Sequence, residues 1–211
     1  MILSKPISLW SSSPAPALAA ENWRRPFPKS IMNTNAACLP VMPNLEFEHR
    51  RVVEPARAAA IKGQERGRGN EGIFCGAAID LGNGTIVTGD NSPQFHAASS
   101  LVLHAIKHLA EIPEKIKLLP SNIVDSVRNL KTNVLNEKTL SLDLMETLIA
   151  LSISATVNPA AQLAMEKLEE LHGREVHMTH IPTPGDEAGL RRLGVSLTSD
   201  PNFSTKDLFI S

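Results

Sequence analysis

The sequence contains no tyrosine, only two tryptophans and two cysteines, and nearly equal numbers of acidic and basic side chains. Aromatic residues make up 4% of the chain, too few for a surface that stacks the bases of single-stranded nucleic acid. The formal net charge is -1, so neither nucleic acid nor an anionic membrane is expected as a partner. The longest apolar stretch, residues 147–157, is shorter than the roughly 20 residues that a membrane-spanning helix needs.

Several motifs of metal and cofactor chemistry are also missing. The two cysteines, Cys38 and Cys75, form neither a CxxC motif nor a disulfide framework, which favours a reducing cytoplasm. The chain has no HExxH sequence for zinc and no GxxxxGK[ST] loop for ATP phosphates. We therefore expect no metal and no cofactor, and whether the protein is an enzyme stays open.

Residues 1–49 differ in character from the rest of the chain. They contain both tryptophans and seven prolines, and proline fixes φ and removes a hydrogen-bond donor. Ala17-Leu18-Ala19 resembles a signal-peptide cleavage site, but Pro6 and a serine run interrupt the apolar stretch before it. An irregular or disordered leader is therefore favoured over a secretion signal.

The remaining sequence predicts alternating strands and helices. Residues 52–64 are typical of a helix, residues 63–70 of a flexible connector, and Asn83-Gly84 of a hairpin turn between two strands. Ser92-Pro93 is expected to open a long helix, whose apolar stripe begins at Leu101. The predicted domains are a leader at 1–49, a helix and connector at 50–72, and an α/β domain at 73–211.

Further elements complete this prediction. Strands are expected at residues 73–81, 85–88, 115–119, 175–181 and 195–198. Ser121 and Ser141 are predicted to cap two helices, and Asn158-Pro159 to open a third. The order of the elements favours a three-layer α/β/α domain with a mixed sheet covered on both faces.

Four long blocks carry a resemblance to a known family. They read RRVVEPARAAA, GNEGIFCGAAIDLGNGTIVTGDNSP, LIALSISATVNPAAQLAMEKL and HMTHIPTPGDEAGLRRLGVSLTSD. From about Arg51 onward the chain resembles the C-terminal part of the bacterial family catalogued as domain of unknown function 1846. Members of that family are longer and have no assigned function, so the resemblance implies a fragment-like member. A peptidase label that some members carry finds no support in the motifs of this chain.

The resemblance also implies a topology like that of cytidine deaminase. Zinc deaminases need a His or Cys ligand, a Glu that shuttles protons, and a PCxxC pair. At the corresponding helix start this chain has His96-Ala97-Ala98, and it contains no PCxxC sequence. One histidine cannot hold a catalytic zinc ion, which takes three protein ligands, so deamination is excluded and only the likeness of fold remains.

The first candidate site is the loop between the second strand and the following helix. Asn91, Ser92 and His96 gather there, and ligands of open α/β sheets bind beyond the strand ends, near the amides that begin a helix. These residues are candidates for binding a phosphate or sugar. The alternative is structural, with Asn91 and Ser92 capping the turn and His96 packing beneath it.

A second strand-to-helix junction, near residues 180–187, supplies the other candidates. His180 is the candidate catalytic acid or base, because the ordinary pKa of histidine lies near neutrality. Thr183 and Asp186 are candidates for ligand binding, although an acidic residue in a first helical turn is also a common stabilising feature. Asp186 and Glu187 would repel a phosphate, so the ligand group expected at this end is a hydroxyl, an amine or a metal. We expect both junctions to meet at one edge of the sheet.

Two functions of different classes follow from this sequence. The first is a cytosolic protein that binds a small phosphorylated or nucleotide-like molecule at these junctions. The alternative is a structural or oligomerisation domain without a ligand, either a homo-oligomer or the partner of a missing N-terminal domain. The small residues Gly76-Ala77-Ala78 let a helix or another backbone approach the strand closely. Together with the short length, they favour the alternative, because a domain cut from a larger protein exposes a former interface.

Overall fold

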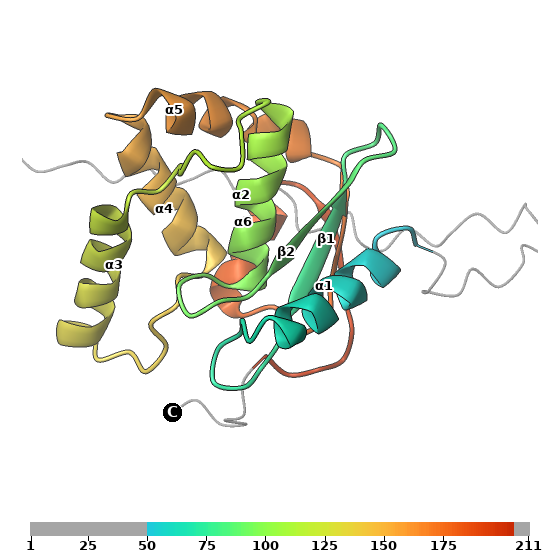
Figure 1. Cartoon of the computed structure of the whole chain (residues 1–211), viewed down its shortest axis with the longest axis horizontal. Helices are drawn as coiled ribbons and strands as arrows, with labels where there is room; N and C mark the ends of the chain where they lie inside the picture. Colours follow the sequence, from blue (N-terminus) through green and yellow to red (C-terminus); the bar gives the residue numbers. More distant parts are fainter. Residues whose placement is uncertain (1–49, 205–211) are drawn as a thin grey trace, which may run out of the picture. The chain divides into compact units, whose positions relative to one another are not determined.

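The structure is a computed structural model that describes residues 50–204. The predicted leader at residues 1–49, with its assignment as disordered, lies outside the described residues. A mixed sheet of four strands in the order β2-β1-β3-β4 stands at the centre of this part of the chain (Figure 1). β1 is antiparallel to both β2 and β3, whereas β3 and β4 are parallel. The strands are β1 (Gly76–Asp80), β2 (Ile86–Asp90), β3 (Glu175–Met178) and β4 (Ser196–Ser199).

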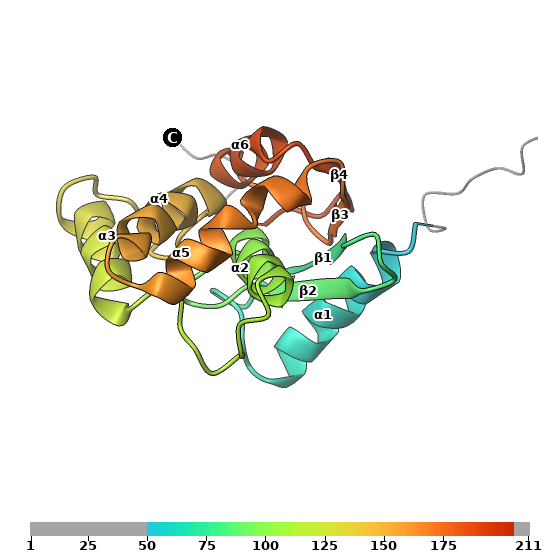
Figure 2. The ribbon, with the colours of Figure 1, turned by 90° about the horizontal axis from the view of Figure 1, so that it is seen from above.

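Helices cover both faces of this sheet, which confirms the predicted three-layer arrangement. Figure 2 shows α1 on one side of the strands and α2, with the helices that follow it, on the other. Whether the topology is that of cytidine deaminase stays a prediction. The helices are α1 (Val53–Glu65), α2 (Ala97–Leu109), α3 (Ser121–Asn133), α4 (Leu144–Ala155), α5 (Pro159–Glu166), the 3-10 helix η2 (Leu168–Leu171) and α6 (Pro184–Arg192).

Two glycines let the helices approach the sheet closely. A Cβ atom on Gly76 would overlap the Ala56 carbonyl oxygen and lie 2.6 Å from the Ala60 nitrogen, both in the α1 backbone. On β2, a Cβ atom on Gly89 would overlap the backbone nitrogen of Leu101 in α2. The close approach of a helix that the small residues of β1 predicted is therefore confirmed at Gly76, and an interface with another chain stays a prediction.

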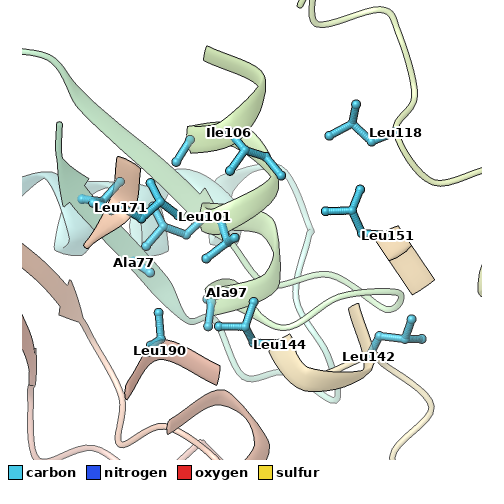
Figure 3. Packing of buried hydrophobic residues seen from close by; sticks show 14 of the residues in the cluster. Ala77, Ala97, Leu101, Ile106, Leu118, Leu142, Leu144, Leu151, Leu171 and Leu190 are labelled. Atoms are coloured by element: carbon cyan, nitrogen blue, oxygen red, sulfur yellow. The ribbon is translucent and has the colours of Figure 1, made fainter. Parts of the chain in front are cut away.

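The main core lies between the sheet and the helices on the α2 side. Leu101 and Ile106 of α2, Leu151 of α4 and Leu190 of α6 are all fully buried and belong to one cluster with Ala77 of β1 (Figure 3). Successive residues of a strand point to opposite faces, so Ala78 instead packs against α1. The apolar stripe predicted from Leu101 onward is thus confirmed as the buried face of α2.

Four local predictions were wrong. The helix expected at Ser92-Pro93 begins later, at Ala97, because residues 92–95 form a turn closed by the Ser92 N–H and the Phe95 carbonyl oxygen, 2.9 Å apart. Residues 115–119 form no strand, although Leu118 and Leu119 are buried. Their apolar side chains pack as a loop segment because no neighbouring strand is there to pair with them.

The other two errors concern helix caps. Asp143, not Ser141, caps α4, and it forms a capping box with Glu146. Ser121 is the first residue of α3 and provides no side-chain cap. The cap at Asn158 is confirmed, since its side chain accepts hydrogen bonds from the two N–H groups at the start of α5, those of Ala160 and Ala161.

A buried polar network, which the sequence did not indicate, ties α1 to the far half of the sheet. Arg57 of α1 donates two hydrogen bonds to the Asp200 carboxylate, at 3.0 and 3.1 Å. His177 of β3 lies 3.4 Å from the same carboxylate through Nε2, and its Nδ1 lies 3.0 Å from the Thr198 hydroxyl. The Arg57 hydrogen bonds lower the pKa of Asp200, and burial lowers the pKa of His177.

Among residues 50–204, no helix has the length and apolar character needed to cross a membrane.

Candidate functional site

The two predicted junctions line one pocket, with a volume of about 380 Å³. β2 and β3 are both antiparallel to β1, so they run in the same direction and their carboxyl ends reach the same edge of the sheet. Asp90 at the end of β2 pairs with Gly76, and Met178 at the end of β3 pairs with the next residue, Ala77. The pocket therefore lies beyond the strand ends, where ligands of open α/β sheets commonly bind.

A histidine and an aspartate join the two junctions. His96, the N-cap residue of α2, places its Nδ1 atom 2.7 Å from Oδ2 of Asp186 in the first turn of α6. The carboxylate accepts this hydrogen bond, so Nδ1 of His96 carries a proton. The other ring nitrogen, Nε2, has no hydrogen-bond partner within residues 50–204, and His96 lines the pocket. The pair thus fixes the ring and leaves Nε2 free to bind.

The Asp186 carboxylate accepts hydrogen bonds from groups at the start of three helices. Besides the His96 ring, its carboxylate accepts the Thr183 hydroxyl at 2.8 Å and the backbone N–H of Leu144 at 2.9 Å. Leu144 is the first residue of α4, and Thr183 caps α6. The Asp186 side chain is only 3% exposed. Its buried charge is therefore stabilised by three donors and by the positive ends of α2, α4 and α6.

The surroundings of His96 favour its protonated form. Burial alone would lower the pKa of His96, but the Asp186 hydrogen bond and charge, with the charge of Asp143, together raise it above the ordinary value. Lys131 acts weakly in the opposite direction. His96 is therefore an imidazolium over a wider pH range than an exposed histidine, and Nε2 then donates a hydrogen bond.

His180, the other histidine of the pocket, has the opposite character. Its Nδ1 lies 2.9 Å from the Thr179 hydroxyl, which itself lies 3.3 Å from the Gly76 carbonyl oxygen. Both contacts are hydrogen bonds only if the hydroxyl donates to Gly76 and the Nδ1–H of His180 donates to the hydroxyl. Burial lowers the pKa of His180, opposed by the charge of Asp200. The ring is therefore neutral near pH 7, and the lone pair of Nε2 has no partner in the described residues.

Asn91 and Ser92 line the pocket but use their side chains to build the junction. The Asn91 amide oxygen accepts the Cys75 N–H at 2.8 Å, and its nitrogen donates to the Ile73 carbonyl oxygen at 3.0 Å. The Ser92 hydroxyl accepts the Phe95 N–H at 3.1 Å. These contacts support the structural alternative for both residues, and their role as ligand contacts stays a prediction.

Two residues of the pocket lining, Asp143 and Lys131, and Gly185 beside the lining were not predicted as part of the site. Asp143 caps α4, and the Asp-x-x-Glu pattern that it begins was the signal in the sequence. Gly185 lies so close to the Asp143 side chain that a Cβ atom at position 185 would overlap Oδ2 of Asp143. The position therefore needs glycine, because α4 and α6 begin side by side there. Buried Lys131, 4% exposed, reaches the pocket from α3, which no local pattern indicated.

Most charges of the pocket are matched by partners of opposite charge or by backbone donors. Lys131 lies 3.2 Å from the Glu137 carboxylate and 2.8 Å from that of Glu146. Asp143 accepts the backbone N–H of Glu146 at 2.9 Å. The carboxylates in the lining are Glu71, Glu137, Asp143 and Asp186. With His96 protonated, the lining has four carboxylates against the two cations Lys131 and His96, so it repels a dianion more strongly than a single negative charge.

Cys75 also lines the pocket, but its thiol is unreactive near neutral pH. The thiol is free and buried, and its burial, with the negative charge of Asp186, raises its pKa to about 12. Because the thiolate is the nucleophilic form, Cys75 is a packing residue near neutral pH. Within residues 50–204, no cluster of three or more His, Cys, Asp or Glu residues is arranged to hold a metal ion.

His104 and His108 of α2 lie away from this pocket. His108 is exposed. His104 is half-buried, with Nδ1 2.9 Å from the Thr88 carbonyl oxygen, so it ties α2 to β2. Both residues border a separate surface hollow over β2.

The fold and the pocket define an α/β protein with a histidine–aspartate pair at the edge of its sheet. Residues 48–209 match the family model described as "Domain of unknown function DUF1846, C-terminal". The chain belongs to this family, as its four sequence blocks predicted.

Bacterial relatives carry the name UPF0371 protein. One from Clostridium botulinum (strain Alaska E43 / Type E3) is 42% identical over 166 residues, which is 79% of this chain. Another from Clostridioides difficile (strain 630) is 41% identical over 168 residues, 80% of this chain. A third, from Clostridium tetani (strain Massachusetts / E88), is 39% identical over 166 residues. In each case the match covers 33% of the relative's own length.

Proposed function

We propose that the pocket between the β2–α2 and β3–α6 junctions binds a small phosphorylated or nucleotide-like molecule. The observation that supports this proposal most strongly is the His96–Asp186 pair. Nδ1 of His96 lies 2.7 Å from Oδ2 of Asp186, and the other ring nitrogen, Nε2, is left free to bind. A side chain held in this way has little freedom left to lose when a ligand binds. The proposal includes a cytosolic location, supported by the free thiol of Cys75.

The N-terminus of α2 supports an anionic group on this ligand. α2 has no side-chain cap, and Ala97, its first residue, lines the pocket. The first N–H groups of a helix have no partner within the helix, and they bind phosphate or carboxylate oxygens. A protonated His96 at the N-cap position adds a charge-assisted donor at the same place.

The apolar residues of the lining suit an apolar or aromatic part of the ligand. Phe95, Met178 and Ile181 all contribute to the lining. A volume of about 380 Å³ lies within the usual range for small-molecule sites. A planar base or a sugar ring with one phosphate matches this combination of an apolar wall and a polar end.

Thermal unfolding with and without ligands tests the proposal. Adenosine 2′,3′-cyclic monophosphate, with one negative charge, is expected to raise the melting temperature by about 5 °C when present far above Kd, and adenosine monophosphate and adenosine to raise it less. His96→Gln should remove most of the shift caused by the phosphorylated compounds. His172→Gln, at an exposed position, is the matched control and should keep it. Absence of a shift with every compound, or an equal shift in His96→Gln, would contradict the proposal.

A structural or oligomerisation role is the second candidate. Ile149, Ile153 and Val157 follow one another at helical spacing along α4 and its C-terminal end, and they are 57%, 51% and 78% exposed. An exposed apolar stripe of this kind favours contact with another surface. Light scattering that finds a strict monomer at high concentration would count against self-association.

A further inference from the structure

We propose that His96 and His180 act together as a proton donor and a proton acceptor in the hydrolysis of a phosphodiester bound in this pocket, with Asp186 as the positioning residue of His96. This inference rests on the proposed function and adds a reaction to it. No metal ion is required, because both proton transfers are assigned to side chains of the chain itself.

Geometry brings the two histidines to one ligand. They come from different junctions, yet both line the same pocket. Each ring has one nitrogen held by the protein, His96 by Asp186 at 2.7 Å and His180 by Thr179 at 2.9 Å. The second nitrogen of each ring has no partner within residues 50–204, so each is available to a bound molecule.

The surroundings of the rings assign a different role to each. Asp186 of α6 and Asp143 at the start of α4 face His96 and hold its proton, while Lys131 of α3 opposes them. His180 faces no carboxylate as close, since only the charge of Asp200 counteracts the effect of its burial. A pair of titratable groups whose pKa values are moved apart in one site is the usual arrangement of an acid and a base. His96 is thus the acid and His180 the base.

The reaction step balances without any further reagent than water. Nε2 of His180 takes a proton from a water molecule, whose oxygen forms a new bond to phosphorus. The bond from phosphorus to the leaving alkoxide oxygen breaks, and Nε2 of His96 gives its proton to that oxygen. The products are a phosphate monoester and an alcohol, and both rings return to their starting states by exchanging protons with solvent.

The charges of the pocket favour a diester over a monoester. A diester carries one negative charge, whereas a monoester carries nearly two at neutral pH. One charge would face the Nε2–H of the protonated His96, whose own charge is paired with Asp186, and the uncapped N-terminus of α2. A second charge would face Asp143 and Asp186 without a further cation, because Lys131 already pairs with Glu137 and Glu146.

Adenosine 2′,3′-cyclic monophosphate is the probe that tests this inference, with the products separated by chromatography. Its alkoxide leaving group needs a proton, so loss of either His96 or His180 is expected to slow hydrolysis by about 100-fold or more. The pH–rate profile of the wild type should be bell-shaped, rising as His180 loses its proton and falling at higher pH as His96 loses its own. His180→Gln should abolish the rising limb, and His96→Gln the falling limb.

Two further variants separate catalysis from folding. Asp186→Asn should move the falling limb to lower pH and leave the rising limb in place, which a merely structural role would not do. His172→Gln should match the wild type. If the cyclic nucleotide raises the melting temperature but is not hydrolysed, or if both histidine variants keep full rates, the inference is wrong while the proposed function stands. If it neither binds nor reacts and no other phosphorylated compound binds, both are wrong.

Discussion

Replacing Asp186 by alanine is expected to lower the free energy of unfolding by about 3–5 kcal/mol, the usual cost of removing one member of a buried charged pair. The variant leaves three donors without their acceptor: the His96 ring, the Thr183 hydroxyl and the Leu144 N–H. It also leaves the His96 ring without its carboxylate partner, so the ring must either stay neutral or carry an unpaired positive charge. Urea denaturation followed by circular dichroism measures the loss.

The loss should depend on pH in a defined direction. Because Asp186 raises the pKa of His96 in the folded protein, the His96–Asp186 interaction contributes fully below the ordinary histidine pKa of about 6.5. Its contribution fades as the pH rises through the raised pKa. The difference in stability between the wild type and Asp186→Ala is therefore largest in mild acid and smaller in mild base.

Glu187→Ala is the matched control, one residue further along α6. Glu187 forms an ion pair with Arg191 in which both side chains are substantially exposed, so its removal should change the stability by less than about 1 kcal/mol. Equal losses in the two variants would mean that the buried network around Asp186 does not stabilise the junction.

Gly76→Ala is expected to have the second largest effect, a loss of about 3 kcal/mol, at the upper end of what overpacking usually costs. The added methyl group would strike the backbone of α1 at Ala56 and Ala60, and backbone atoms cannot rotate aside as a side chain does. α1 must then move away from β1. The midpoint of urea denaturation reports the loss, provided that its slope is unchanged.

Gly63→Ala, a substitution in α1, is expected to have the opposite effect on stability. A Cβ atom on Gly63 would lie 3.4 Å from the Cβ atom of Asp90, an ordinary contact. Alanine favours the helix over glycine by up to about 1 kcal/mol, so this variant should be slightly more stable than the wild type. If Gly76→Ala were as stable as Gly63→Ala, α1 would not be packed as closely on β1 as the structure has it.

Periodic patterns made most of the fold predictable. The Asn158-Pro159 pair, the apolar stripe from Leu101 and the small residues of β1 each identified a local feature that the structure contains. The segment at 115–119 misled because its apolar residues have no strand period, and a buried loop has the same composition as a buried strand. Ser141 misled because the chain places a better acceptor, Asp143, two residues later.

The candidate site was predictable only at the level of its two junctions. The rule that ligands bind beyond strand ends selected both segments that now line the pocket. This rule could not predict which side chains of the two junctions form hydrogen bonds with each other. His96 and Asp186 lie 90 positions apart in the sequence, and the residues around either one do not indicate the contact. The approach of Lys131 from α3 likewise depends on tertiary packing, whereas a role of Asn91 and Ser92 in building the turn was the structural alternative drawn from the sequence.

The central claim is that Asp186 holds His96 as a proton donor beside a neutral His180. Titration of the histidine rings by NMR, in the wild type and in Asp186→Asn, tests it most directly. The predicted result is a pKa for His96 above about 6.5 and a pKa for His180 below it, with only the His96 value falling in the variant. A His96 ring that titrates at or below 6.5 in the wild type, unaffected by the substitution, would contradict the account.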